Sequence, residues 1–381
     1  MAKDQIFLDY ASATPVDPQV LAVMLPYFGD RFFNPSSLYA VARDLKAELH
    51  SARMVVADLI QAHADEIIFT GSGTEADNLA LRGICQSALG GKHLIVSAIE
   101  HQAILATAQD LERQGWSVTY LPVNALGIVE LSTLKQALRP ETVLVSIMLA
   151  NNEIGTIQPL REIAKVVHAH GALVHTDATQ ALSMLPVSVR ELGVDLMTVT
   201  SAKIYGPKGA AALYVRRGTE LHPTLTGGFQ EGGLRAGTEN MPAIVGFAEA
   251  CRLLMIGREQ QMTRVELLRD QLMAAVLKIP HTTLNGSATD RLVNNLNVTF
   301  EGIEGDMLLL FLDELGIQVS SGSACTAMSV SPSHVLVALG RSATEAKSSV
   351  RFTLGWPTTA REVEYVLSKL PDLVAKLRSR M

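Results

Sequence analysis

The stretch VLVSIMLANNEIGTIQPLREIAKVVHAHGALVHT, residues 143–176, decides the fold. Its two ends, 143–148 and 173–176, are short runs rich in β-branched and apolar residues, as in strands that are buried on both faces. Between them, residues 160–170 repeat apolar side chains at the spacing of an amphipathic helix. A strand, a helix and a second strand in this order predict a βαβ unit with two parallel strands.

The same alternation extends in both directions, from about residue 50 to about residue 215. Further apolar runs predict strands, again buried on both faces, at residues 67–70, 94–97, 118–121 and 196–199. Because successive βαβ units share one sheet, the sequence predicts an α/β fold with a mostly parallel sheet.

The C-terminal third has a different pattern. Residues 242–278 are helical in pattern and charged on one side, which predicts a long connector out of the first domain. Beyond it the sequence predicts a strand at 292–300, a helix at 307–315 and a final helix at 360–378. These elements predict a smaller α+β unit.

The length supports two domains, because single cores stop growing at roughly 250–300 residues and this chain has 381. We expect a large domain at residues 15–255. Residues 1–14 and 256–381 would form the small domain.

The composition argues against several classes of partner. The formal net charge is -6, with 32 Lys and Arg spread among 38 Asp and Glu, so no basic stripe favours nucleic acid. No uncharged apolar run approaches the roughly 18–20 residues of a membrane span. Residues 1–5 carry both signs of charge, unlike a secretory signal, so we expect a cytoplasmic protein.

The chain has three cysteines, Cys85, Cys251 and Cys325. They lie too far apart in the sequence to suggest disulfides or a metal site, so any cysteine with a function acts as a thiol.

Polar residues collect after the predicted strands, where ligands of open α/β sheets bind. GSGTEADN at 71–78 is a glycine turn opening a helix, whose backbone N–H groups could bind a phosphate together with the Thr74 hydroxyl. Helix capping alone also explains such a turn. His101 and Asn152 follow two other strands, and turn chemistry explains each of them equally well.

Two further strand ends are more informative. Asp177 ends one strand, with Gln180 three residues on, and Lys203 follows the next strand. An aspartate at the floor of a site can keep a pyridinium nitrogen protonated, and a lysine can form a Schiff base with a carbonyl cofactor. Taken singly, each has a structural explanation, as a helix cap or a surface lysine.

Three segments in order resemble the cysteine desulfurases, a family of fold-type-I pyridoxal-phosphate enzymes. They are DATQ at 177–180, TSAKIYGPKG at 200–209 and SSGSACT at 320–326. The likeness runs from LDYASAT at 8–14 to RFTLG at 351–355, nearly the whole chain. It implies a large domain with a mostly parallel seven-stranded sheet and a smaller α+β C-terminal domain. It also implies that the enzyme converts L-cysteine to L-alanine and holds the sulfur as a persulfide.

The resemblance assigns roles to individual residues. Lys203 would form the Schiff base with pyridoxal phosphate, Asp177 would pair with the ring nitrogen, and His101 would lie over the ring and transfer protons. The remaining implied contacts are Gln180 and Asn152 at the ring oxygen, Gly73, Thr74 and Thr200 at the phosphate, and Arg351 with Asn152 at the substrate carboxylate. Thr238 resembles the threonine that reaches the phosphate of a neighbouring subunit, which implies a homodimer.

Cys325 would receive the sulfur and pass it to an acceptor protein, an iron–sulfur scaffold or a sulfurtransferase, which the sequence does not identify. A nucleophile that serves both the cofactor and an acceptor needs a mobile loop, and residues 320–333 are rich in small residues. Most free cysteines are instead buried small hydrophobic residues, and we keep that interpretation for Cys85 and Cys251.

The sequence also departs from the family pattern. Ala202 stands where histidine usually precedes the cofactor lysine, and Gly232 and Trp356 stand where arginine is common. The missing histidine predicts weaker cofactor retention. These changes keep one alternative open, a homologue that binds cofactor with impaired turnover. A second alternative is a related enzyme, such as a selenocysteine lyase or class V aminotransferase, although an aminotransferase has no need of Cys325.

Overall fold

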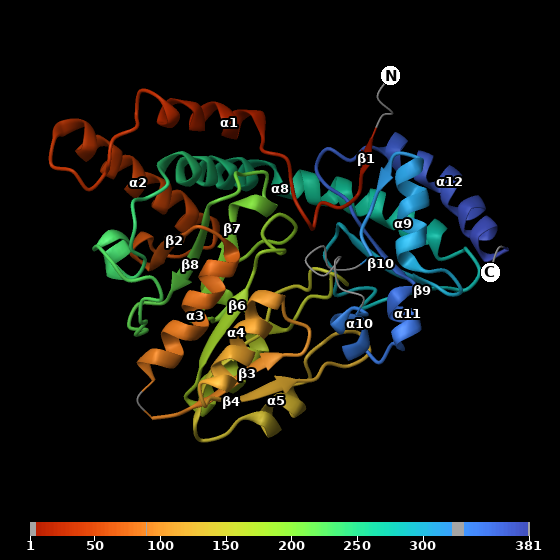
Figure 1. The fold of residues 1–381 in the computed structure, drawn as a ribbon, viewed down its shortest axis with the longest axis horizontal. Coiled ribbons are helices and arrows are strands. Elements are labelled where there is room, and N and C mark those ends of the chain that lie inside the picture. The colour runs from red at the N-terminus through yellow and green to blue at the C-terminus, as the bar shows by residue number, and fades with distance from the viewer. Residues whose placement is uncertain (1–4, 89, 322–330, 380–381) are drawn as a thin grey trace.

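The computed structural model describes residues 5–88, 90–321 and 331–379. Within these ranges the strands form three sheets (Figure 1). The largest has seven strands in the order β2-β8-β7-β6-β5-β3-β4, the second has the order β12-β10-β9, and the third pairs β1 with β11. The predicted α/β class, with a mostly parallel seven-stranded sheet and a smaller C-terminal unit, is confirmed.

The large sheet contains every strand predicted for it and one that was missed. Its strands are β2 Ile67–Thr70, β3 His93–Ser97, β4 Ser117–Leu121, β5 Thr142–Ser146, β6 Leu173–Asp177, β7 Leu196–Thr200 and β8 Ala211–Val215. Strands β3 to β7 pair in parallel, whereas β8 runs antiparallel between β2 and β7. We missed β8 because it is short and begins with two alanines, which are depleted in strands.

Strand β4 corrects a second expectation, since it is not buried on both faces. Ser117 is exposed, the next three residues are half-buried, and only Leu121 is fully buried. β4 is an edge strand with β3 as its only neighbour, but β2 at the other edge is buried throughout, so the edge position contributes to this exposure without accounting for it alone.

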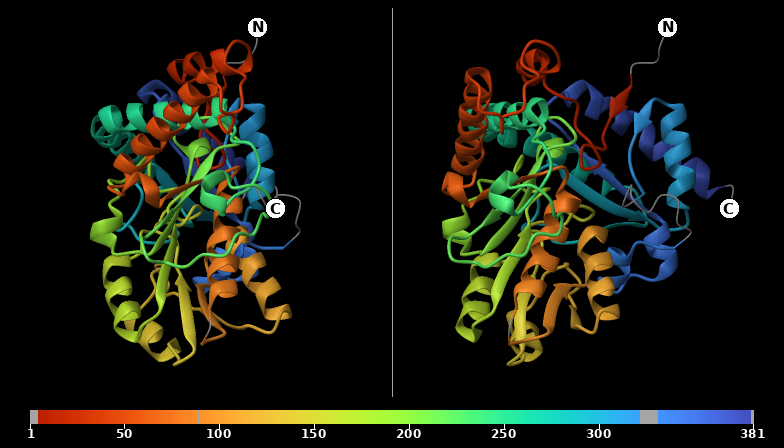
Figure 2. Two further views of the ribbon diagram at one scale, coloured as in Figure 1. Left: turned by 90° about the vertical axis from the view of Figure 1, so that its left-hand side faces the viewer. Right: turned by 60° about the vertical axis from the view of Figure 1, so that its left-hand side comes forward.

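Helices cover both faces of the large sheet (Figure 2). On one face, α3 Gly73–Ser87 and α4 Gln102–Arg113 pack against side chains such as Leu94 and Val96. On the other face, α2 Ala40–Leu59 and α6 Leu160–His170 pack against side chains that include Ile95. The alternation of neighbouring residues between two cores is the period-2 geometry of a strand. The remaining described helices before residue 240 are α1 Pro18–Met24, α5 Leu131–Ala137, α7 Val189–Leu192 and the 3-10 turns η1 Leu25–Phe28, η2 Ala64–Glu66, η3 Ser201–Lys203 and η4 Gln230–Gly233.

The predicted connector is one continuous helix, α8 Met241–Val276, of 36 residues. It packs against α1 and α2 and also against α12 of the C-terminal part. The predicted domain boundary at residues 255 and 256 falls inside this helix, and it stays a prediction.

The C-terminal part is built on an antiparallel sheet of β9 Thr282–Leu284, β10 Asn295–Phe300 and β12 Ser349–Thr353. Its helices are α9 Gly305–Glu314, α10 His334–Ala338, α11 Ala343–Lys347 and α12 Ala360–Arg378, so the helices predicted at 307–315 and 360–378 are confirmed. Strand β10 begins later than predicted, because Asn295 N–H bonds the Leu292 carbonyl in a turn.

The N-terminal segment connects the two parts. Strand β1, Ile6–Phe7, pairs in parallel with β11, Ile317–Gln318, so the red start of the chain lies beside the blue C-terminal elements in Figure 1. A few residues later, the Thr14 hydroxyl donates to the carbonyl of Ala202 at 3.1 Å, next to β7. Residues 8–14 therefore cross from the small sheets to the large one. No helix within the described residues is long and apolar enough to cross a membrane.

Candidate active site

A cavity of about 210 Å³ lies at the carboxyl ends of the parallel strands. Of the predicted site residues that the structure describes, all but Thr238 line it: Gly73, Thr74, His101, Asn152, Asp177, Gln180, Thr200, Lys203 and Arg351. The residues that the sequence analysis did not select are Ala11, Ser12, Asp77, Met148, Ala150, Thr179 and Ala202. One edge of the sheet thus gathers a lysine, an arginine, a histidine and two aspartates.

Asp177 lies at the end of β6 and is 7% exposed. Its Oδ1 accepts the backbone N–H of Thr179 at 2.8 Å, and this bond fixes the orientation of the carboxylate. Gln180, one residue further, donates from Nε2 to the carbonyl of Ala11 at 3.0 Å. The N-terminal segment therefore holds the amide of Gln180 at the cavity.

Asp77 is a second buried acid in this cavity. It lies four residues after Gly73, on the same face of α3, which is the signal in the sequence that could have identified it. Its Oδ1 has no hydrogen-bond partner. Burial, and then the nearby Asp177 carboxylate, raise the pKa of Asp77 well above its usual value. Burial also raises the pKa of Glu100 behind the cavity to about 8. Asp77 and Glu100 therefore favour their protonated forms.

Lys203 ends the 3-10 turn that follows β7, and its Nζ donates to the carbonyl of Ser12. The turn is tightly built, because a Cβ at Gly206 would lie 2.0 Å from the Ser201 hydroxyl and Tyr205 has a positive φ of 64°. Ser12 belongs to a quoted motif to which the sequence analysis gave no role. The structure shows that this motif contacts the predicted cofactor lysine.

His101 is both a helix cap and a cavity residue. Its Nδ1 accepts the backbone N–H of Ala103 at 3.1 Å at the start of α4. Since Nδ1 is the acceptor, the neutral ring carries its proton on Nε2. The two interpretations of His101 offered by the sequence are therefore compatible.

The predicted phosphate residues lie together at the N-terminus of α3. Ser72 caps the helix by accepting the N–H of Glu75 at 3.1 Å. A Cβ at Gly73 would lie 3.9 Å from the Cβ of Thr200, so the first turn of α3 and the end of β7 are neighbours. Helix N-termini bind anions through their free N–H groups and the helix dipole.

Arg351, on β12, is one of the largest fully buried side chains. Its Nη2 pairs with Asp9 Oδ1 at 2.6 Å, and its Nη1 donates to the carbonyl of Asn152 at 2.9 Å. Its Nε has no hydrogen-bond partner.

Cys325 lies outside the described residues, but both sides of its segment are described. Ser320 exchanges two backbone hydrogen bonds with Arg351, at 2.6 and 3.1 Å. On the other side, Ser333 donates to Glu153 at 2.5 Å, and the ring of His334 bonds the carbonyl of Glu100 at 3.0 Å. Ser320 thus bonds a cavity residue directly, whereas the other end bonds Glu153 and Glu100, the sequence neighbours of the cavity residues Asn152 and His101.

The other two cysteines are buried, as expected. Burial raises the pKa of Cys85 to about 12 and also raises the pKa of Cys251. Thiols that resist ionisation are poor nucleophiles.

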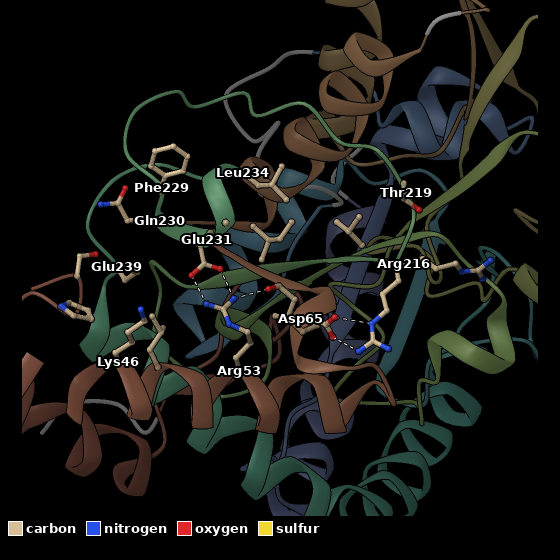
Figure 3. Close-up of a pocket in the computed structure, with 18 of the residues that line it drawn as sticks. Lys46, Arg53, Asp65, Arg216, Thr219, Phe229, Gln230, Glu231, Leu234 and Glu239 are labelled. Atoms are coloured by element: carbon tan, nitrogen blue, oxygen red, sulfur yellow. Dashed lines mark hydrogen bonds and ion pairs between the residues drawn. The ribbon is translucent and has the colours of Figure 1, made fainter. Parts of the chain in front are cut away.

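Thr238 is exposed and does not line the cavity of its own chain. It lies just after η4, beside a second and larger cavity of about 570 Å³. Figure 3 shows that Glu231 and Arg53 point toward one another in this cavity, joined by bonds of 2.5 and 2.6 Å. Phe229, next to them, is 94% exposed.

The three departures from the family pattern lie in different places. Ala202 lines the first cavity, and Gly232 lines the second, where its φ is 66°. Trp356 lies against Tyr205, with ring centroids 5.0 Å apart. Only Ala202 therefore changes the lining of the first cavity. Among the described residues, no group of three or more His, Cys, Asp or Glu side chains could hold a metal ion.

A mostly parallel seven-stranded sheet, with a lysine and an aspartate at its strand ends, defines a broad class of enzymes. Residues 6–366 match the family model described as aminotransferase class-V. The chain is 44% identical to the cysteine desulfurase IscS of Dictyoglomus turgidum over 379 residues, 99% of this chain and 96% of that protein. It is 46% identical to the cysteine desulfurase IscS of Methanosarcina thermophila over 375 residues, 98% of this chain and 93% of that protein. The chain therefore belongs to the cysteine desulfurases of the aminotransferase class-V family.

Solved structures agree with this assignment. A structure described as a NifS-like protein superimposes with a TM-score of 0.92 at 33% identity, covering 98% of this chain and all (100%) of that one. A structure described as SspA in complex with cysteine gives a TM-score of 0.82 at 38% identity and covers 92% of this chain and 98% of that one.

Proposed function

We propose that this chain uses pyridoxal phosphate to remove the sulfur from L-cysteine, releases L-alanine and holds the sulfur as a persulfide on Cys325. The observation that carries the proposal is the meeting of Lys203, Asp177, His101 and Arg351 in one cavity. The curated relatives are named cysteine desulfurases, and we extend their activity to this chain.

The cavity residues fit this cofactor by their chemistry. Lys203 offers an amine for its aldehyde, Asp177 an anion for its ring nitrogen, and the N-terminus of α3 a site for its phosphate. Thr74, Gly73 and Thr200 would complete the phosphate site, and Gln180 and Asn152 would contact the ring oxygen. When bound, pyridoxal phosphate supplies an electron sink that stabilises negative charge at the α-carbon of an amino acid.

Arg351 would bind the α-carboxylate of cysteine, because its guanidinium lines the cavity and has N–H groups beyond the two that bond Asp9 and Asn152. His101 would deliver a proton from Nε2, which carries it in the neutral ring because Nδ1 is engaged by the backbone of Ala103, and would regain a proton there afterwards. Lys203 and His101 are the two side chains to which we assign proton transfer.

Cys325 would act as the nucleophile. An S–S bond forms between its thiolate and the substrate sulfur while the C–S bond of the substrate breaks, and the carbon fragment gains a proton and leaves as alanine. The positions of the two flanks support this role, because Ser320 bonds the cavity residue Arg351 and His334 bonds Glu100, which directly precedes the cavity residue His101.

We also propose a homodimer in which Thr238 reaches the phosphate site of the partner. Its exposed position and the neighbouring exposed Phe229 support this, since a large exposed aromatic side chain often marks an interface. The persulfide would pass to an iron–sulfur scaffold or a sulfurtransferase in the cytoplasm.

The test is to purify the protein, record the absorbance of bound cofactor, add L-cysteine and measure alanine together with persulfide on Cys325. Cys325→Ala should keep the cofactor absorbance and lose both products. Cys85→Ala, which removes a buried thiol, is the matched control and should keep both products. Keto-acid formation would indicate an aminotransferase, activity with selenocysteine alone a selenocysteine lyase, and bound cofactor without any product an impaired homologue.

A further inference from the structure

The buried guanidinium of Arg351 forms an ion pair with Asp9. The Arg351 side chain is 2% exposed, and a guanidinium at such a depth is costly unless an anion balances its charge. Asp9 supplies that anion, with its Oδ1 at 2.6 Å from Nη2. Asp9 itself does not line the cavity, so it contacts the arginine from behind.

The hydrogen bonds of Arg351 leave part of the guanidinium available. Nη2 donates to Asp9 and Nη1 donates to the carbonyl of Asn152, whereas Nε has no partner. An arginine binds a carboxylate best through two N–H groups on one edge. Nε is enclosed by protein atoms, but a guanidinium has five N–H groups, so Arg351 keeps further N–H groups on Nη1 and Nη2 for a ligand in the cavity that it lines.

The backbone of Asp9 is itself fixed. Residue 9 bridges Thr353 on β12, and its carbonyl accepts both the N–H and the hydroxyl of Ser12, at 2.9 and 2.7 Å. The carbonyls of Ala11 and Ser12 then hold Gln180 and Lys203. The same short segment therefore sets the positions of three cavity residues.

We infer that Asp9 is a positioning residue for substrate recognition, which anchors and charge-balances Arg351 so that the guanidinium is held at the cavity to receive the substrate α-carboxylate. This inference rests on the proposed function only in naming the ligand as an amino acid. Asp9 acts through Arg351 and touches no reacting atom.

The role predicts a separation of KM from kcat. Asp9→Ala should raise KM for L-cysteine at least about 10-fold and change kcat less than about 3-fold, because an interaction made equally in the ground and transition states is lost. Asp9→Asn keeps an oxygen acceptor and removes the charge, so its KM should rise by a smaller factor. Asp17→Ala is the matched control: Asp17 is an acid of the same segment that only caps α1, and KM should be unchanged.

A double-mutant cycle tests whether Asp9 acts through Arg351. In an Arg351→Ala background, Asp9→Ala should cause no further loss of kcat/KM. Equal losses in both backgrounds would overturn the inference, and so would unchanged KM in both Asp9 variants. Cofactor absorbance and a urea unfolding curve show whether each variant is folded.

A binding measurement separates this inference from the proposed reaction. Calorimetric titration of the cofactor-loaded protein with L-alanine should give a Kd that is at least about 10-fold weaker in Asp9→Ala than in the wild type, matching the KM change. An unchanged Kd overturns the inference. A wild type that binds L-alanine without turning over L-cysteine contradicts the proposed function, and the Kd comparison then still decides the role of Asp9.

Discussion

The two cavities of this protein differ in volume and in how far the polar side chains that line them are paired. The larger, about 570 Å³, is lined by charges that pair with one another, such as Arg53 with Glu231 and Arg217 with Asp65. The smaller, about 210 Å³, is lined by buried polar atoms without partners, Asp77 Oδ1 and Arg351 Nε. Buried polar groups are nearly always satisfied, and the larger cavity has one exception too, Glu239 Oε2. The smaller cavity differs in placing its exceptions on a buried acid and a buried guanidinium, beside a lysine and a histidine.

The largest expected difference concerns one lysine from each cavity. Lys203→Ala in the smaller cavity should lower alanine formation from L-cysteine at least about 1,000-fold, because it removes the proposed cofactor attachment and a proton-transfer group. Lys46→Ala in the larger cavity should change the rate less than about 2-fold, because Lys46 is an exposed surface residue. Steady-state rates at equal cofactor loading check both. A comparable loss in both variants would remove the distinction between the cavities.

The larger cavity should instead matter for stability. Glu231 is buried and accepts hydrogen bonds from Arg53 and from the backbone N–H of Phe69 at 2.8 Å. Glu231→Ala leaves the guanidinium of Arg53 without an acid and should lower the free energy of unfolding by about 3–5 kcal/mol. Urea unfolding measures this change. The folded variant should keep kcat within about 3-fold, and a large fall in kcat would contradict a structural role.

The buried acids around the smaller cavity should make stability depend on pH. The pKa of Glu100 is raised to about 8, so the folded state binds its proton more tightly than the unfolded state. Stability conferred by this residue is therefore greatest at low pH and falls as pH rises from about 4.5 to about 8, by up to about 1.4 kcal/mol per pH unit. Glu100→Gln should flatten this part of the profile in urea unfolding measured at several pH values. An identical slope in the variant would show that Glu100 ionises normally.

The smallest effect concerns cofactor retention. Ala202 lines the smaller cavity where the family usually has histidine. Ala202→His should restore a hydrogen bond to a charged group, worth on the order of 1.5–3 kcal/mol, and so slow the loss of cofactor during dialysis. Absorbance after dialysis measures this retention. No change would show that another group already fills the gap.

The sequence was informative about the residues that directly follow the strands of the large sheet. The strand ends indicated that Asp177, His101 and Lys203 lie at the ligand-binding edge of the sheet, whereas their roles were implied only by the resemblance to the cysteine desulfurases. Thr74 and Gly73 followed from the same rule together with helix-capping chemistry.

The contacts that hold these residues could not be predicted in the same way. Asp9 pairs with Arg351 across 342 positions of sequence, and Ser12 reaches Lys203 across 191. No local pattern encodes such pairs, because they depend on how the N-terminal segment crosses between sheets. The exposure of β4, to which its edge position contributes, was missed for a similar reason, since sequence does not say which strand is at the edge.

Helix α8 has a mechanical consequence. Its 36 residues at about 1.5 Å each make an unbroken rod of roughly 54 Å, packed against α1 and α2 and also against α12. A rod of this length acts as a lever, so a tilt of about 5° at one end displaces the other by roughly 5 Å. A small shift of the side chains packed between α2 and α8 would thus produce a larger displacement where α8 packs against α12.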